Sequence, residues 1–128
     1  MILSKVLLVE DDPDIQKVVQ MSLKFRGVGE VVVANNGEEC LAVVGQVKPD
    51  VILLDVMMPT LDGFETCRRL KANPETRAIP VIFLTAKAQH FEVKKGLEVG
   101  AVGYLIKPFD PMTLQEQIIA LLDQTASS

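Results

Sequence analysis

Residues 51–63 read VILLDVMMPTLDG, and this stretch decides the fold of the chain. It opens with four consecutive apolar residues, the pattern of a strand that is buried on both faces of a parallel sheet covered by helices. Asp55 follows directly, at the carboxyl end of this strand, where open α/β sheets bind their ligands. Pro59 and the pair Asp62-Gly63 then predict a loop and a turn before the next helix. We therefore expect the loop to hold the Asp55 carboxylate in the open, ready for chemistry.

Strand-like and helix-like segments alternate on both sides of this central stretch. The strand patterns cover 5–9, 31–34, 51–54, 81–84 and 102–106, and a helix-length segment follows each. This alternation predicts an α/β domain with a doubly wound, five-stranded parallel sheet and helices on both faces. Right-handed crossovers favour the flavodoxin-like strand order 2-1-3-4-5, in which strands one and three are neighbours.

The helix boundaries are predicted from proline, glycine and the spacing of apolar residues. Pro13 is suited to the first turn of the first helix, and Gly27 closes it. Residues 86–100 have only weak periodicity, so the fourth helix is the least defined. Asp110-Pro111 is expected to open the last helix. We predict one domain over 1–124 with a flexible polar tail over 125–128.

Composition limits the class of protein. The length of 128 residues fits one domain, and the longest apolar run, Ile118 to Leu122, is too short to span a bilayer. The start lacks the pattern of a signal peptide, so we expect a cytoplasmic protein without a membrane partner. A net charge of -4 argues against direct nucleic-acid binding. Cys40 and Cys67 lack metal-binding spacing and are predicted to be buried free thiols.

Polar side chains stand at the carboxyl ends of four predicted strands, and we expect them to meet at one edge of the sheet. Several carboxylates that are forced together either take up protons or bind a divalent cation. Oxygen ligands point to Mg²⁺. A phosphate oxygen often completes the coordination of this ion in proteins, so a phosphoryl group is the expected substrate. These side chains are Glu10, Asp11, Asp12, Asp55, Thr85 and Lys107.

Asp55 is the best placed of these residues to act as a nucleophile and form an aspartyl phosphate. The positive charge of Lys107 and the hydroxyl of Thr85 could bind the oxygens of the phosphoryl group during its transfer. Asp12, by contrast, is expected to stabilise the amino terminus of the helix that follows.

Four segments together resemble the receiver domain of two-component response regulators, of the chemotaxis-regulator type: VLLVEDDPDI, VILLDVMMPTLDGFE, VIFLTA and GYLIKPF. The resemblance covers nearly the whole chain. It implies that Asp55 accepts a phosphoryl group from the phosphohistidine of a histidine kinase or phosphotransfer protein. It also implies that Asp11, Asp55 and the main-chain carbonyl of Met57 hold Mg²⁺, while Glu10 acts through a water molecule.

The resemblance further implies a conformational switch and a downstream partner. Thr85 and Tyr104 match the switch residues of the family, and the Lys107-Pro108 peptide is expected to be cis. Phosphorylation would then alter a surface on the fourth helix, fifth strand and fifth helix that binds an effector protein or an output domain. A phosphorylation-dependent homodimer is a further possible partner, but the last helix contains no Lys or Arg, which argues against a dimer that uses basic residues of this helix.

A Mg²⁺-dependent phosphatase with an aspartate nucleophile is the alternative function. That chemistry uses a second acid two residues after the nucleophile, a position that Met57 occupies here. Hydrolysis of the acyl phosphate should then be slow, and we expect a self-phosphorylating acceptor, not a turnover enzyme. A nucleotide or flavin binder is disfavoured because neither glycine-rich phosphate motif occurs. The cognate kinase, the pathway and any larger parent protein stay open.

Overall fold

The structure is a computed structural model that describes residues 3–58, 61–86 and 90–127. Its strands are β1 (Lys5–Val9), β2 (Glu30–Ala34), β3 (Val51–Asp55), β4 (Val81–Thr85) and β5 (Gly103–Ile106). Its helices are α1 (Pro13–Phe25), α2 (Gly37–Val47), α3 (Gly63–Ala72), α4 (His90–Glu98) and α5 (Leu114–Ser127). The strands are parallel in the order β2-β1-β3-β4-β5, which confirms the predicted topology.

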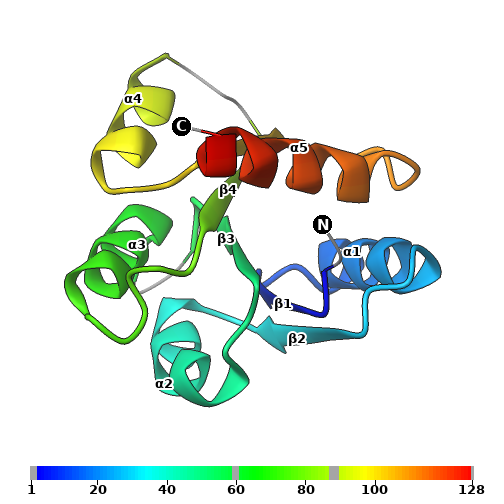
Figure 1. Ribbon diagram of the computed structural model, residues 1–128, viewed down its shortest axis with the longest axis horizontal. Helices are drawn as coiled ribbons and strands as arrows, with labels where there is room; N and C mark the ends of the chain where they lie inside the picture. The colour runs from blue at the N-terminus through cyan, green and yellow to red at the C-terminus, as the bar shows by residue number, and fades with distance from the viewer. Residues whose placement is uncertain (1–2, 59–60, 87–89, 128) are drawn as a thin grey trace.

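The sheet lies between two layers of helices (Figure 1). α1 and α5 cover one face, and α2, α3 and α4 cover the other. Successive residues of a strand point to opposite faces, so Leu53 joins the core beneath α1 and α5 while Leu54 joins the core beneath α2 and α3. Both side chains are fully buried. The unbroken apolar run of β3 is therefore explained by the helices on its two sides.

The β1–α1 connection begins as the sequence predicts. The side chain of Asp12 is the N-cap of α1 and accepts a hydrogen bond from the main-chain NH of Asp14 at 2.9 Å, while Pro13 occupies the first helical position. Gly27 follows the helix with a φ of 93°, a conformation that glycine adopts without strain. The structural role predicted for Asp12 is confirmed.

The last helix begins later than the sequence predicts. Residues 111–113 form a turn in which the Asp110 carboxylate accepts from the NH of Met112 at 2.9 Å, and α5 begins only at Leu114. The carbonyl groups of Pro111 and Met112 accept hydrogen bonds from Ser22 of α1 and from Arg26, the C-cap of this helix, both at 2.5 Å. These contacts with α1 explain the delayed start. At the other end, α5 continues through Ser127, so residues 125–127 of the predicted tail are helical, and Ser128 lies outside the described residues.

Other features of the fold match the sequence analysis. Cys40 and Cys67 are buried free thiols in the core beneath α2 and α3. The weak periodicity of residues 86–100 corresponds to a short helix, α4. Within the described ranges, the helices lack the combined length and apolar character that a membrane span requires.

Candidate functional site

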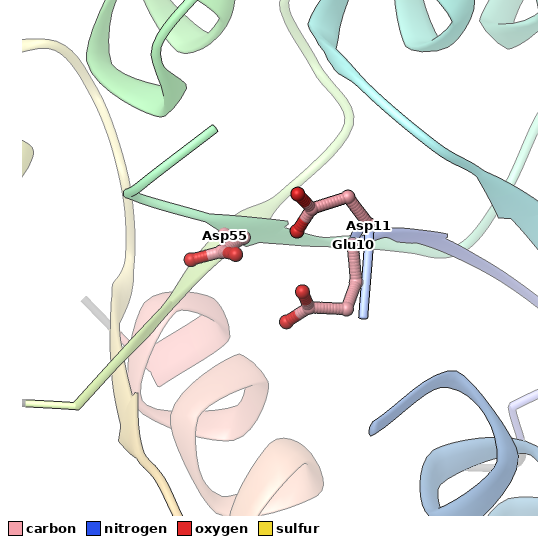
Figure 2. Close-up of side chains that lie close together, drawn as sticks. All are labelled: Glu10, Asp11 and Asp55. Atoms are coloured by element: carbon pink, nitrogen blue, oxygen red, sulfur yellow. The ribbon is translucent and has the colours of Figure 1, made fainter. Parts of the chain in front are cut away.

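Parallel pairing places the acidic residues at one edge of the sheet. Val9 of β1 pairs with Leu54 of β3, so Glu10 and Asp11 leave β1 beside Asp55 at the end of β3. Figure 2 shows the carboxylates of Glu10 and Asp11 on the side of their loop that faces Asp55. One carboxylate oxygen from each of these three residues lies within 4.8 Å of the others. The predicted cluster of acids is therefore present.

Lys107 completes this cluster from the end of β5. Its main-chain NH donates to the carbonyl of Thr85 at 2.7 Å, which extends the pairing of β4 and β5 and brings the lysine to the edge. Its Nζ lies 2.6 Å from Oε1 of Glu10 and 3.3 Å from Oδ2 of Asp55. The Lys107-Pro108 peptide is cis, as the family resemblance implied. We call Glu10, Asp11, Asp55 and Lys107 the acidic edge.

The two oxygens of the Asp55 carboxylate have different partners. Oδ1 accepts a hydrogen bond from the main-chain NH of Met57 at 3.1 Å, and Oδ2 forms the ion pair with Lys107. Asp55 is only 4% exposed, so the expectation that its carboxylate stands in the open is wrong, whereas Met57 beside it is 77% exposed. The carboxylate is thus held in a defined orientation, and the residue two positions later has an exposed thioether side chain, not an acid.

Burial controls the charge of Glu10. Its removal from solvent raises the pKa of the carboxyl group from 4.5 to about 7, although Lys107 and the NH of Asp12 stabilise the ionised form. Burial alone would lower the pKa of Lys107, but the carboxylates of Glu10 and Asp55 outweigh it and raise that pKa. The lysine is therefore charged at neutral pH, and burial favours the protonated form of Glu10.

The predicted switch residues lie near the acidic edge but are not part of its charged cluster. Thr85 is buried at the end of β4, next to β3. Tyr104 pairs with Phe83 further back in the sheet, and the two ring centroids are 5.6 Å apart. Tyr104 is half-buried beneath α4 and packs against the core of that face. The structure thus brings Thr85 to the end of β4 beside the site and places the Tyr104 ring against Gly96 of α4.

Two features of this region were missed by sequence reasoning. The side-chain amide of Gln16 on α1 donates to the main-chain carbonyl of Glu10 at 2.6 Å, and a glutamine at a helix start gives no sequence signal for this role. An apolar groove of ≈ 410 Å³ also opens beside Lys107. It is lined by Asp14, Ile15, Val18, Ala86, Pro108, Phe109 and Pro111.

Comparison with known proteins agrees with this geometry. The sequence profile of the response regulator receiver domain matches residues 6–119. The phosphate regulon transcriptional regulatory protein PhoB of Pseudomonas aeruginosa is 41% identical over 120 residues, which are 94% of this chain and 52% of that protein. The chain spans about half the length of the curated relatives it matches.

Solved structures share the whole fold. The chemotaxis protein CheY4 of Vibrio cholerae superposes with a TM-score of 0.87 at 34% identity, over 93% of this chain and 98% of that one. The receiver domain of the sensor histidine kinase PA1611 from Pseudomonas aeruginosa has a TM-score of 0.83 at 32% identity, over 94% of this chain and 98% of that one. That structure has a magnesium ion coordinated in its active site cleft.

Proposed function

The chain belongs to the response regulator receiver domain family, and from this we propose that Asp55 accepts a phosphoryl group from the phosphohistidine of a histidine kinase or phosphotransfer protein. One observation carries the proposal: the Asp55 carboxylate lies at the carboxyl end of the central strand, 3.3 Å from the Lys107 ammonium and beside two further acids. An anionic nucleophile held next to a fixed positive charge is suited to attack on an anionic phosphorus centre.

The acidic edge fits a Mg²⁺ ion by the chemistry of its ligands. All three clustered donors are carboxylates, and hard divalent cations prefer oxygen ligands. We infer that Asp11, Asp55 and the main-chain carbonyl of Met57 hold the ion and that Glu10 contacts it through water. When bound, Mg²⁺ neutralises the charge of the phosphoryl oxygens. The PA1611 receiver domain, with magnesium in its cleft, supports this assignment.

The transfer step follows from the orientation of Asp55. One Asp55 oxygen attacks phosphorus as the P–N bond of the phosphohistidine breaks, and the imidazole nitrogen leaves with the bonding electron pair. The ammonium of Lys107 then pairs with a phosphoryl oxygen, and the Thr85 hydroxyl donates to another. Asp55 becomes an acyl phosphate, and the phosphodonor leaves as a neutral histidine because the second ring nitrogen of its phosphoimidazolium already carries a proton.

Slow hydrolysis distinguishes this function from the phosphatase alternative. A phosphatase would need a base beside the nucleophile to activate water, and the position two residues after Asp55 is Met57. The main chain of Met57 contacts Asp55, while its exposed side chain has no basic group. We therefore infer a phosphorylated signalling state that outlives the transfer step, and not a turnover enzyme.

We propose that the phosphorylated protein signals to its partner through the surface formed by α4, β5 and α5. Leu97 of α4 and Ile106 of β5 are large apolar side chains that are 54% and 55% exposed, and we infer that they contribute to the surface that binds a partner. Thr85 and Tyr104 connect this surface to the acidic edge. The partner is an effector protein, an output domain or a second phosphorylated copy.

Contact with DNA is a separate proposal that concerns any larger protein. Curated relatives such as PhoB are transcriptional regulators, and this chain matches about half of their length. Because the chain has a net charge of -4, we assign DNA contact to a partner or to a further domain, not to this domain.

Incubation with Mg²⁺ and acetyl phosphate tests the proposed function. Intact mass spectrometry should detect one phosphate adduct on the wild type and none on Asp55→Asn, which removes the nucleophilic oxygen. Asp14→Asn is the matched control, because Asp14 is an exposed acid on α1 outside the acidic edge, and it should be phosphorylated like the wild type. Continuous release of inorganic phosphate without an adduct would instead indicate the phosphatase, and an adduct on Asp55→Asn would contradict the assignment of the acceptor.

A further inference from the structure

The side-chain amide of Gln16 joins three elements next to the acidic edge. Its Nε2 donates to the main-chain carbonyl of Glu10 at 2.6 Å and to Oδ1 of Asn35 at 2.9 Å. Gln16 belongs to the first turn of α1, Glu10 follows β1, and Asn35 follows β2. The amide nitrogen carries two protons, so one side chain makes both hydrogen bonds at once.

The hydrogen bond from Gln16 to the carbonyl of Glu10 helps to orient the side chain of Asp11. The carbonyl of Glu10 belongs to the peptide group that joins Glu10 to Asp11, and this group is planar. Holding its oxygen therefore fixes the plane from which the Asp11 side chain leaves the main chain. The Glu10 side chain is held separately, because Oε2 accepts from the NH of Asp12 at 3.1 Å and Oε1 pairs with Lys107 at 2.6 Å.

The second hydrogen bond makes Gln16 itself rigid. Asn35 accepts from Gln16 and its Nδ2 also donates to Glu39 of α2 at 3.4 Å, so the glutamine amide is anchored to the end of β2 and to the next helix. An anchored donor holds its acceptor in a narrower range of positions than a mobile donor, which loses side-chain entropy each time it binds.

We propose that Gln16 is a positioning residue for Asp11, and that it tunes the affinity of the acidic edge for a divalent cation. This inference rests on the proposed function, because it takes Asp11 to be a Mg²⁺ ligand. Groups that orient metal ligands without touching the metal typically change metal affinity by about 10- to 100-fold when they are removed. Gln16 acts through the main chain of its neighbour, and we place its effect at about tenfold, the lower end of that range.

The test is a titration of isotopically labelled protein with MgCl₂ alone, followed by NMR at the amides of Asp11 and Asp12. Gln16→Met keeps the length of the side chain and removes both donors, so the Kd for Mg²⁺ should rise about tenfold. Phosphorylation by acetyl phosphate should be slower at low Mg²⁺ and return to the wild-type rate at saturating Mg²⁺. Gln20→Met, one turn further along α1, is the control and should keep the wild-type Kd.

Asn35→Ala gives a second, independent measurement. It removes the anchor but leaves the bond between Gln16 and Glu10, so its Kd should lie between those of the wild type and Gln16→Met. A wild-type Kd in Gln16→Met overturns the proposal, and a lower unfolding midpoint in urea with an unchanged Kd does so too, because it shows a purely structural role. Failure of the wild type to bind Mg²⁺ would overturn the proposed metal site itself. The wild-type titration therefore distinguishes an error in the metal site from an error in the role of Gln16.

Discussion

Burial changes the chemistry of individual side chains on both sides of the sheet. At the acidic edge it raises the pKa of Glu10 to about 7, in spite of an ion pair with Lys107. In the core beneath α2 and α3 it raises the pKa of Cys40 to about 12 and that of Cys67 to about 11. In each case the pKa rises because ionisation would place a negative charge in a site that excludes water.

The two thiols should be unreactive in the folded protein. Their pKa values are raised above the ordinary value of 9.0, so burial disfavours the nucleophilic thiolate. We expect iodoacetamide near pH ~8.5 to leave both cysteines unmodified in native buffer and to alkylate both in concentrated urea, as measured by intact mass. The contribution of the neutral thiols to stability is complete below pH 9.0 and is lost as the pH rises through about 11 to 12. Equal alkylation rates in both buffers would contradict the burial of these residues.

At the scale of elements, α4 depends on a glycine that faces Tyr104. A Cβ built at Gly96 would clash with the Tyr104 hydroxyl oxygen and would lie 2.8 Å from Cζ of that ring and 3.1 Å from Cδ2 of Phe83. Phe83 is fully buried and cannot retreat easily, whereas Tyr104 is half-buried. The absence of a side chain at Gly96 therefore provides the space that Tyr104 occupies beneath α4.

Gly96→Ala should move the Tyr104 ring toward solvent. The chain contains one tyrosine and no tryptophan, so tyrosine fluorescence reports on this ring alone. We expect stronger quenching by acrylamide in Gly96→Ala than in the wild type. Gly45→Ala on α2 is the matched control, since a Cβ there meets nothing within 4 Å. The control should keep wild-type quenching and gain up to about 1 kcal/mol in the free energy of unfolding from helix propensity. Unchanged quenching in Gly96→Ala would show that α4 shifts instead of Tyr104.

The whole molecule consists of two cores that share one sheet. Leu53 and Leu54 are neighbours in β3 but belong to different cores, and both are fully buried. Ser22 of α1 donates to the carbonyl of Pro111 in the turn before α5, and Arg26, the C-cap of α1, forms an ion pair with Glu116 of α5 at 3.0 Å. Stability should therefore depend on both layers, and neither helical layer should be dispensable.

Leu53→Ala and Leu54→Ala should each lower the free energy of unfolding by about 2–5 kcal/mol, because each leaves a cavity in a packed core. Urea unfolding followed by circular dichroism measures both losses. Phe25→Ala is the control, because Phe25 is a large apolar side chain that is 82% exposed, and its loss should change stability by no more than about 0.5 kcal/mol. A loss in only one of the two leucine variants would mean that one layer contributes little to cooperative folding.

Much of the architecture was determined by the sequence alone, because the relevant signals are local. Apolar runs in β1, β3 and β4 identify buried strands, and proline, glycine and capping acids mark the start and end of α1. Parallel strands present their carboxyl ends at the same edge, so Glu10, Asp11, Asp55, Thr85 and Lys107 could be assigned to one region before any coordinates were known.

Only the tertiary structure decided the properties that depend on residues far apart in the chain. Ser22 and Pro111, whose hydrogen bond spans 89 positions, help to delay the start of α5. The 2.6 Å contact between Lys107 and Glu10, the raised pKa of Glu10 and the hydrogen bond from Gln16 all require the packed arrangement of strand ends and α1. Distance and burial are properties of the folded chain, and no local pattern encodes them.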